Sequence, residues 1–279
     1  DGHFTGAHAP FLKLSRNDVF RVAHNVLLCI GKAEKAMRKV AGHKLRLGVS
    51  PCFNPRLPTS ERDKELTEKY NFEPDGTFYD GCFFTDALIK GEFTDEYKKW
   101  FKKYGYNPSD ADLKIIKSNF DFFGANYYEG VYVKNDCGKM TKLPVAPSDK
   151  VTAMGWKVTP EGIEYLVKYY YDRYGLPIIF FENGVALSEW KTLDGDIPDY
   201  MRIDYIKRHV EVIKKVSEKL PVIGYFYWTF MDNFEWTHGY TKRFGLVYVD
   251  YATLERTPKK SAYWFKKMTE SNGEDLKID

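Results

Sequence analysis

The alternation of apolar and polar positions along the chain predicts a regular succession of helices and strands. Apolar residues recur at helical spacing over residues 15–40, with Ser15 and Asp18 as a capping box and Gly42 as the terminator. The face expected to be buried consists of Val19, Val22, Val26, Ile30, Ala33, Met37 and Val40. Further helices are expected over residues 59–70, 79–90, 159–175, 203–216 and 260–269.

Four apolar runs lie between these helices and are typical of buried strands. They cover residues 45–53 (LRLGVSPCF), 120–128 (FDFFGANYY), 177–181 (PIIFF) and 222–230 (VIGYFYWTF), and a long polar loop is expected after the second. Strands that alternate with helices predict an α/β fold with a parallel sheet and crossover helices on its outside. An open doubly wound sheet and part of a (β/α) barrel both fit this order, and the absence of a glycine-rich dinucleotide fingerprint favours the barrel.

Length and composition indicate one folded domain over residues 1–279, without a linker that would divide it. The 42 basic and 39 acidic residues are scattered, which argues against a nucleic-acid or anionic-lipid partner, and no apolar run is long enough to cross a membrane. The four cysteines show no metal-binding or disulfide spacing, so we expect no metal or cofactor and free, mostly buried thiols. Free thiols favour a cytoplasmic location, but the chain begins at Asp1 without Met, which leaves localisation open.

Polar side chains gather where the strands end, amid aromatic residues, and this is the main functional signal. The positions are Asn126, Tyr128, Glu182, Asn183, Trp228, Asp232, Asn233, Glu235 and Trp236. A carboxylate beside a buried apolar strand costs desolvation energy, and glycoside hydrolysis is one chemistry that needs such a group. Trp228, Trp236, Phe244 and Trp156 could supply aromatic faces for a sugar. The plainer interpretation is that Glu182 belongs to an ion-pair network and that Trp228 is core.

Two segments resemble the most specific motifs of glycoside hydrolase family 1. They are LPIIFFENGVA at residues 176–186 and GYFYWTFMDNFEWTHGYTKRFGLVYVD at residues 224–250. The likeness extends to GHFTGAHAP followed by RVAHNVLL, to FDFFGANYY and to TAMGWKVTPEGI, in the order of the family. The resemblance therefore implies a (β/α)8 TIM-barrel type of fold, here the half barrel of strands five to eight.

The resemblance implies a role for each candidate in a retaining β-glycosidase. Glu182 would be the nucleophile, Tyr128 would hydrogen-bond and orient it, and Asn126 would shape the same pocket. The substrate would be an unphosphorylated β-glucoside or β-galactoside, and Trp228 would stack beneath its sugar ring. The substrate-binding residues Glu235 and Trp236 would contact the sugar hydroxyls, and Trp156 would lie nearer the aglycone. One departure is Phe181, which stands where the family usually has Thr or Ser.

The family's acid/base Glu sits in a Thr-x-Asn-Glu-Pro motif, and these 279 residues contain no such motif. Read without the family, Glu235 or Glu129 could be proposed as the second carboxyl group beside Glu182. Two hypotheses stay open, a β-glycosidase whose remaining barrel strands come from elsewhere and an inactive sugar-binding remnant. Because an opened barrel exposes two edge strands, we expect a complementing N-terminal barrel fragment or self-association.

Overall fold

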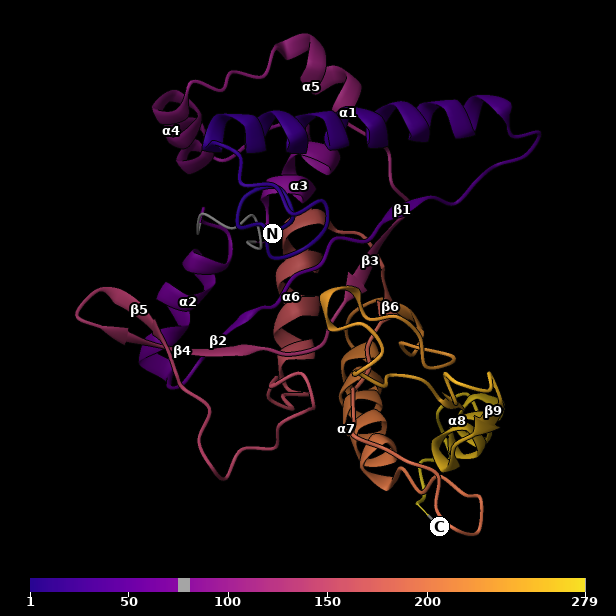
Figure 1. Cartoon of the computed structure of the whole chain (residues 1–279). Helices are drawn as coiled ribbons and strands as arrows, with labels where there is room; N and C mark the ends of the chain where they lie inside the picture. Colours follow the sequence, from indigo (N-terminus) through magenta and orange to yellow (C-terminus); the bar gives the residue numbers. More distant parts are fainter. Residues whose placement is uncertain (75–80, 279) are drawn as a thin grey trace.

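The computed structural model describes residues 1–74 and 81–278, and its centre is a four-stranded parallel sheet (Figure 1). The strand order is β1 (Gly48–Val49), β3 (Phe122–Asn126), β6 (Ile178–Glu182) and β7 (Val222–Tyr225). All three neighbouring pairs are parallel. Three of the strands fall within predicted apolar runs, and β6 extends one residue beyond its run, to Glu182. The predicted order and direction of the strands are confirmed.

Helices cover one face of this sheet, as expected of crossover helices. They are α6 (Gly162–Tyr174) and α7 (Tyr200–Ser217), with α8 (Lys260–Glu270) packed against α7. Phe123, Ile178 and Phe180 point outward from the sheet and share one buried cluster with Leu166 and Ile213 of the helices. The opposite face carries Phe181 and Phe226, which are 36% and 57% exposed. This is the arrangement of a (β/α)8 barrel over half of its strands.

The first helix, α1 (Arg16–Val40), begins as predicted but buries a different face. Ser15 caps it, since its hydroxyl accepts a hydrogen bond from the Asp18 amide at 3.2 Å. The buried residues are Val19, Phe20, Ala23, Leu27, Gly31 and Glu34, whereas much of the predicted face, Val26, Ala33, Met37 and Val40, is exposed. The helix packs on α5 (Asp110–Ile116) through its second apolar stripe. The helix ends at Val40 as predicted, but its C-cap is extended Ala41 and not Gly42.

A long connecting segment, the excursion, lies between β1 and β3 and contains most of the remaining helices. It contains β2 (Arg56–Pro58), η1 (Glu61–Asp63), α2 (Lys64–Asn71), α3 (Phe83–Thr85), the π-helix η2 (Asp86–Lys90), α4 (Asp95–Tyr104) and α5. The helix predicted over 59–70 corresponds to η1 and α2. The one predicted over 79–90 lies partly outside the described residues and continues as α3 and η2. Aromatic packing around Phe83 and Phe101 joins this excursion to α1.

The segment after β3 is not the long polar loop that was predicted. β4 (Val131–Asp136) and β5 (Lys139–Lys142) form an antiparallel hairpin, and β2 pairs with β4 in parallel. Near the C-terminus, β8 (Val247–Val249) and β9 (Arg256–Pro258) form a second short ribbon after the η3 turn (Trp236–His238). These four strands were missed because each has only three to six residues, which is too short for an apolar pattern to stand out in the sequence.

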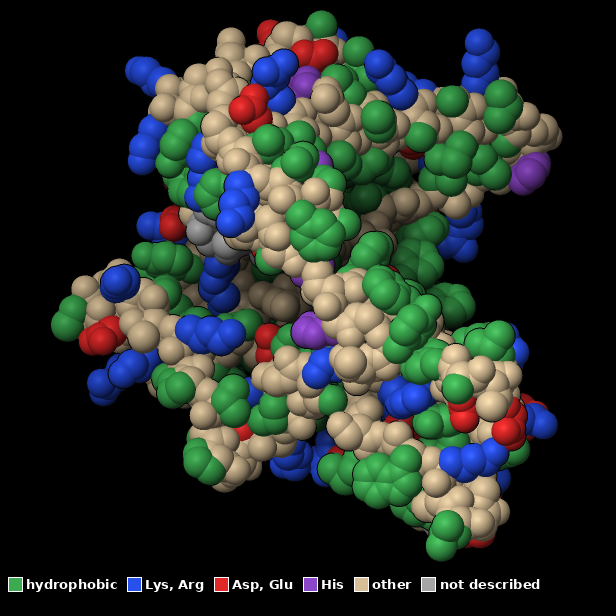
Figure 2. All heavy atoms as spheres, in the orientation of Figure 1, with side chains coloured by type: hydrophobic (Ala, Val, Ile, Leu, Met, Phe, Trp, Pro, Cys, Tyr) green, Lys and Arg blue, Asp and Glu red, His purple; other side chains and the backbone are tan. Residues whose placement is uncertain are grey.

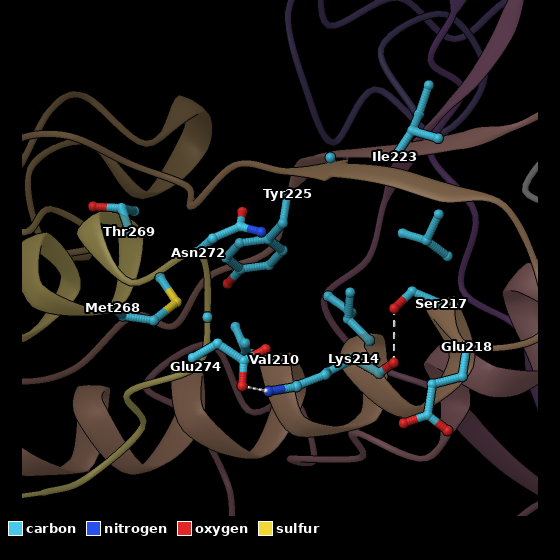
Figure 3. A pocket seen from close by; sticks show the side chains of 14 residues that line it. Val210, Lys214, Ser217, Glu218, Ile223, Tyr225, Met268, Thr269, Asn272 and Glu274 are labelled. Carbon is cyan, nitrogen blue, oxygen red and sulfur yellow. Dashed lines mark hydrogen bonds and ion pairs between the residues drawn. The ribbon is translucent and has the colours of Figure 1, made fainter.

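Both edges of the central sheet are open in the described part of the chain. A hollow of about 720 Å³ runs beside β7 and is lined by Ile223, Tyr225 and Lys214, among others (Figure 3). A second hollow of about 490 Å³ lies beside β1 and is lined by Val22, Val26 and Ile30 of the exposed α1 stripe. The predicted pair of unpaired edge strands is therefore present, and each edge has a cavity next to it.

Two further expectations concern the thiols and the membrane. All four cysteines are free, but only Cys82 is buried, so the expectation of mostly buried thiols was wrong. Across residues 1–74 and 81–278, no helix has the length and apolar content needed to span a bilayer. The space-filling view shows apolar side chains scattered over the visible surface, with Lys and Arg interspersed among them (Figure 2).

Candidate active site

The centre of the candidate site is the carboxyl end of β6, where the buried strand delivers Glu182 to the open side of the sheet. The Tyr128 hydroxyl donates a 2.7 Å hydrogen bond to Glu182 Oε2. Asn126 pairs with Glu182 in the register of β3 and β6, and its Oδ1 accepts a 2.7 Å hydrogen bond from Ser50. Desolvation and the negative charge of Glu182 both raise the pKa of Tyr128, so this phenol remains a donor at neutral pH.

Cys52 is a member of the site that the sequence analysis did not single out. It forms an isolated bridge with Asn126 at the end of β1. Crowding by protein atoms and the negative charge of Glu182 raise the pKa of Cys52 to about 11, although part of the residue stays exposed. The group next to the carboxylate is thus a neutral thiol rather than a second anion.

An aromatic wall stands beside Glu182. The rings of Tyr128 and Trp156 lie 5.3 Å apart, and Phe244 lies 6.1 Å from Tyr128 and 6.3 Å from Trp156. Phe244 is only 3% exposed, so its ring is buried and offers little surface to a ligand. The predicted residues Tyr128, Trp156 and Phe244 are therefore brought together, with Phe244 as their packing support.

The segment after β7 brings the remaining predicted residues to the same end of the sheet. Trp228 is half-buried, follows β7, and its backbone N–H donates to the Asn183 carbonyl at 2.9 Å. The peptide bond between Trp228 and Thr229 is cis. Glu235 is half-buried, and desolvation together with the charge of Glu182 raises its pKa. Trp236 is 69% exposed.

A buried ion network lies behind this segment and was not anticipated from the sequence. Asp232 accepts hydrogen bonds from Arg243 at 2.6 Å and from Lys259 at 3.0 Å. Lys259 also contacts Glu189, which in turn pairs with Arg202 at 2.6 Å. Arg202 is fully buried and donates to the backbone carbonyls of Val185 and Phe244 and to the Asp199 carboxylate. The network ties the end of β6 to the segment that carries Trp228 and Glu235.

Glu129 does not stand free at the site. Its Oε2 accepts a 3.1 Å hydrogen bond from the Lys157 backbone amide, and desolvation raises its pKa. A carboxylate used in this way holds the loop that follows β5 against β3. The contact explains its position without a role in chemistry.

With this geometry in view, comparison with known proteins decides the family. The sequence model of the family described as "Glycosyl hydrolase family 1" matches residues 1–274 of this chain. The chain belongs to glycosyl hydrolase family 1. Beta-glucosidase A of Thermotoga maritima is 34% identical over 98% of this chain, and the 1,4-beta-D-glucan glucohydrolase of Thermotoga neapolitana is 33% identical over 98%. The matched part is 60% and 61% of those relatives, so the chain spans about three-fifths of their length.

Solved structures of family 1 enzymes agree with the fold. The beta-glucosidase from Thermotoga maritima in complex with glucoimidazole superposes with a TM-score of 0.86 at 33% identity, over 98% of this chain and 61% of that one. The same enzyme in complex with deoxynojirimycin gives a TM-score of 0.85 at 32% identity, with the same coverage. The partial (β/α)8 barrel predicted from the sequence is confirmed.

Phe181, the expected departure from the family pattern, is accommodated by local packing. The ring stacks on Phe226 at 5.9 Å and meets Phe122 edge-on at 5.9 Å. It lies over Gly124, where a Cβ would come within 2.5 Å of the ring. A glycine on the neighbouring strand thus provides the space that the larger side chain needs.

Proposed function

We propose that this chain, as a single partial-barrel domain, carries the nucleophile and glycone-binding part of a retaining β-glycosidase. The observation that supports it best is the Tyr128–Glu182 hydrogen bond at the carboxyl end of a parallel sheet, in a chain that belongs to glycosyl hydrolase family 1. A Glu182 oxygen would bond to the anomeric carbon as the bond from that carbon to the leaving oxygen breaks. Water would later release the sugar from the glycosyl-enzyme with retained configuration.

The surrounding residues suit the recognition of a neutral sugar. Trp228 would stack on the apolar face of the pyranose, while Glu235 would accept hydrogen bonds from its hydroxyls and Trp236 would donate one. Asn126 would help to shape the pocket beside Glu182, and Trp156, supported by Phe244, would face the aglycone. A Glu235 carboxylate would repel a sugar 6-phosphate, so the substrate we propose is an unphosphorylated terminal β-D-glucoside or β-D-galactoside.

The second carboxyl group of the mechanism has no good candidate among the described residues. Retaining enzymes place the two groups about 5–5.5 Å apart, one to protonate the leaving oxygen and later to activate water. Glu129 is held by the Lys157 amide, and we assign Glu235 to the glycone hydroxyls. An acid/base residue from a further part of the barrel would complete the site.

The open edges of the sheet suggest where that further part binds. The partner we propose is an N-terminal barrel fragment equivalent to the share of the relatives that this chain does not cover. It would pair with β1 and β7, fill the two hollows beside them, and cover the exposed Val26 and Met37 of α1 and Ile223 of β7. Edge pairing supplies backbone hydrogen bonds, and apolar side chains in the hollows supply burial.

The nucleophile is tested by trapping. The chain is incubated with a 2-deoxy-2-fluoro-β-glucoside of dinitrophenol, whose phenolate leaves with the electron pair of the broken bond and needs no acid. Peptide mass spectrometry should find the fluoroglucosyl group on Glu182 and none in Glu182→Gln. Glu161→Gln is the matched control, because Glu161 also accepts a hydrogen bond from a tyrosine, Tyr132, but on the surface. A folded chain with no adduct would overturn activity of this chain alone and favour either obligate complementation by the further barrel fragment or an inactive sugar-binding remnant.

The partner surface is tested by sedimentation velocity over a range of chain concentrations. We expect self-association of the isolated chain that Ile223→Lys on the β7 edge weakens. Val145→Lys is the control, since Val145 is similarly exposed at 51% but lies in the loop after β5. A rigid monomer at every concentration would contradict the proposal that these edges bind a partner.

A further inference from the structure

We propose that Asn183 and Tyr205 form a buried lock that sets the position of Tyr128 and Glu182. Neither residue touches the substrate in this proposal, so both are positioning residues. The kinetic part rests on the proposed function, whereas the geometric part concerns the folded chain alone.

Asn183 follows Glu182 and uses both ends of its amide across the carboxyl end of the sheet. Its Nδ2 donates to the Tyr127 carbonyl at 2.8 Å and to the Tyr205 hydroxyl at 3.1 Å. Its Oδ1 accepts from the Tyr225 hydroxyl at 3.0 Å. The side chain is 0% exposed, so all three bonds form away from water, where an unmatched amide would be costly. One amide therefore links the ends of β3, β6 and β7 with helix α7.

Tyr205 carries the link from Asn183 to the partner of the nucleophile. While accepting from Asn183, its hydroxyl donates to the Tyr128 carbonyl at 3.2 Å. The ring is 2% exposed and stacks on His209 at 3.9 Å. Because α7 fixes the ring, the hydroxyl is a rigid anchor for the Tyr128 backbone, and the Tyr128 side chain then reaches Glu182.

Backbone hydrogen bonds make the same junction rigid on both sides of Asn183. The Tyr127 amide donates to the Glu182 carbonyl at 2.8 Å, and the Trp228 amide donates to the Asn183 carbonyl at 2.9 Å. The peptide groups of Glu182 and Asn183 are thus held to neighbouring strands. Among the described residues, no backbone–backbone hydrogen bond is seen at Tyr128, and it is the Tyr128 carbonyl that accepts from the Tyr205 hydroxyl.

The geometric part is tested with 3-fluorotyrosine in place of Tyr128, because its ¹⁹F line reports the hydrogen bond to Glu182. Glu182→Ala gives the line of a free phenol. Tyr205→Phe should move the line towards that reference, and Tyr225→Phe, which only removes a donor to Asn183, should move it less. Tyr106→Phe is the control, since it deletes a buried hydroxyl bonded to His24 at 2.6 Å, far along the chain from this junction. An unchanged line in both folded variants would overturn the lock.

The kinetic part is read from trapping by the fluoroglucoside, separated into binding and bond formation. A misplaced nucleophile lowers the rate constant of labelling, and we expect a loss of roughly tenfold to a hundredfold in Tyr205→Phe with little change in the concentration for half-maximal rate. Equal rate constants in Tyr205→Phe and Tyr106→Phe would overturn the positioning role. If the unmodified chain is not labelled but the ¹⁹F line shifts, the proposed function fails and the lock stands.

Discussion

Tyr128 and Glu182 lie 54 positions apart in the chain, yet the hydroxyl of one donates a 2.7 Å hydrogen bond to the carboxylate of the other. Parallel pairing of β3 with β6 brings them together, because the carboxyl ends of parallel strands meet at one edge of the sheet. The same edge holds Asn126 and, through the segment after β7, Trp228 and Glu235. The relation between these two residues therefore depends on the whole sheet.

Replacing Tyr128 by Phe should slow attack by Glu182 about tenfold or more. A hydrogen bond to a charged group contributes about 1.5–3 kcal/mol, and the bond also orients the carboxylate. The measurement is the rate constant for labelling by the fluoroglucoside. Tyr132→Phe is a matched control because Tyr132 also donates to a carboxylate, that of Glu161, at the surface. Equal rates in the two variants would rule out the orienting role of Tyr128.

Gly184→Ala should disturb the contact between the end of β6 and the segment that carries Trp228. A Cβ on Gly184 would lie 1.8 Å from the Trp228 carbonyl oxygen, which is backbone and cannot rotate away. We expect a loss of about 1–3 kcal/mol in the free energy of unfolding, as for other overpacked sites. Gly42→Ala is the control, since a Cβ there meets nothing within 4 Å. Urea denaturation of both variants checks this, and similar midpoints would contradict it.

Lys259→Met should cost about 3–5 kcal/mol, because it leaves the Asp232 and Glu189 carboxylates buried with fewer partners. Lys259 itself is 0% exposed, and desolvation lowers its pKa. By contrast, Lys191 pairs with Glu255 while 37% and 61% of their side chains are exposed, so Lys191→Met should cost about 0–1 kcal/mol. Unfolding free energies from denaturant titration test the difference. Equal losses would show that the buried network contributes no more than a surface pair.

The burial of the His209 side chain predicts that the folded chain loses stability in mild acid. Burial lowers the pKa of His209 from 6.5 to about 4 in the folded chain. The unfolded chain therefore binds the proton first, and the contribution is present above pH 6.5 and is lost as the pH falls towards 4. The free energy of unfolding should fall by about 3 kcal/mol over this range relative to His209→Phe. Parallel pH profiles of the two proteins would contradict this origin of the acid sensitivity.

The structure confirms those predictions that depend on local patterns. The four apolar runs became the four parallel strands because length, β-branched or aromatic content and flanking turn residues are properties of short segments. Glu182 directly follows one of these runs, so its place at the rim of the sheet followed once a parallel sheet was assumed. The order of the strands could be inferred because crossover connections usually join neighbouring parallel strands and are right-handed.

Predictions that needed a partner from elsewhere in the chain were incomplete or wrong. Helix α1 has two apolar stripes, and only its packing on α5 selects the one containing Phe20, Ala23 and Leu27. The hairpin of β4 and β5 escaped notice because its strands are stabilised by pairing with each other and with β2. One signal in the sequence was available for Tyr205, a hydroxyl on the buried face of a helix, which requires a hydrogen-bond partner.

By itself, the sequence determined the four strands of the central sheet, most of the longer helices, the family resemblance and the candidates at the strand ends, because these are recorded in residue type and spacing. Only the tertiary structure decided which groups surround Glu182. Distant segments are joined by the three hydrogen bonds of Asn183, by the hydrogen bonds of buried Arg202 and by the packing of Phe181 over Gly124. Such contacts require shape and distance in three dimensions, and no periodicity of the chain encodes them.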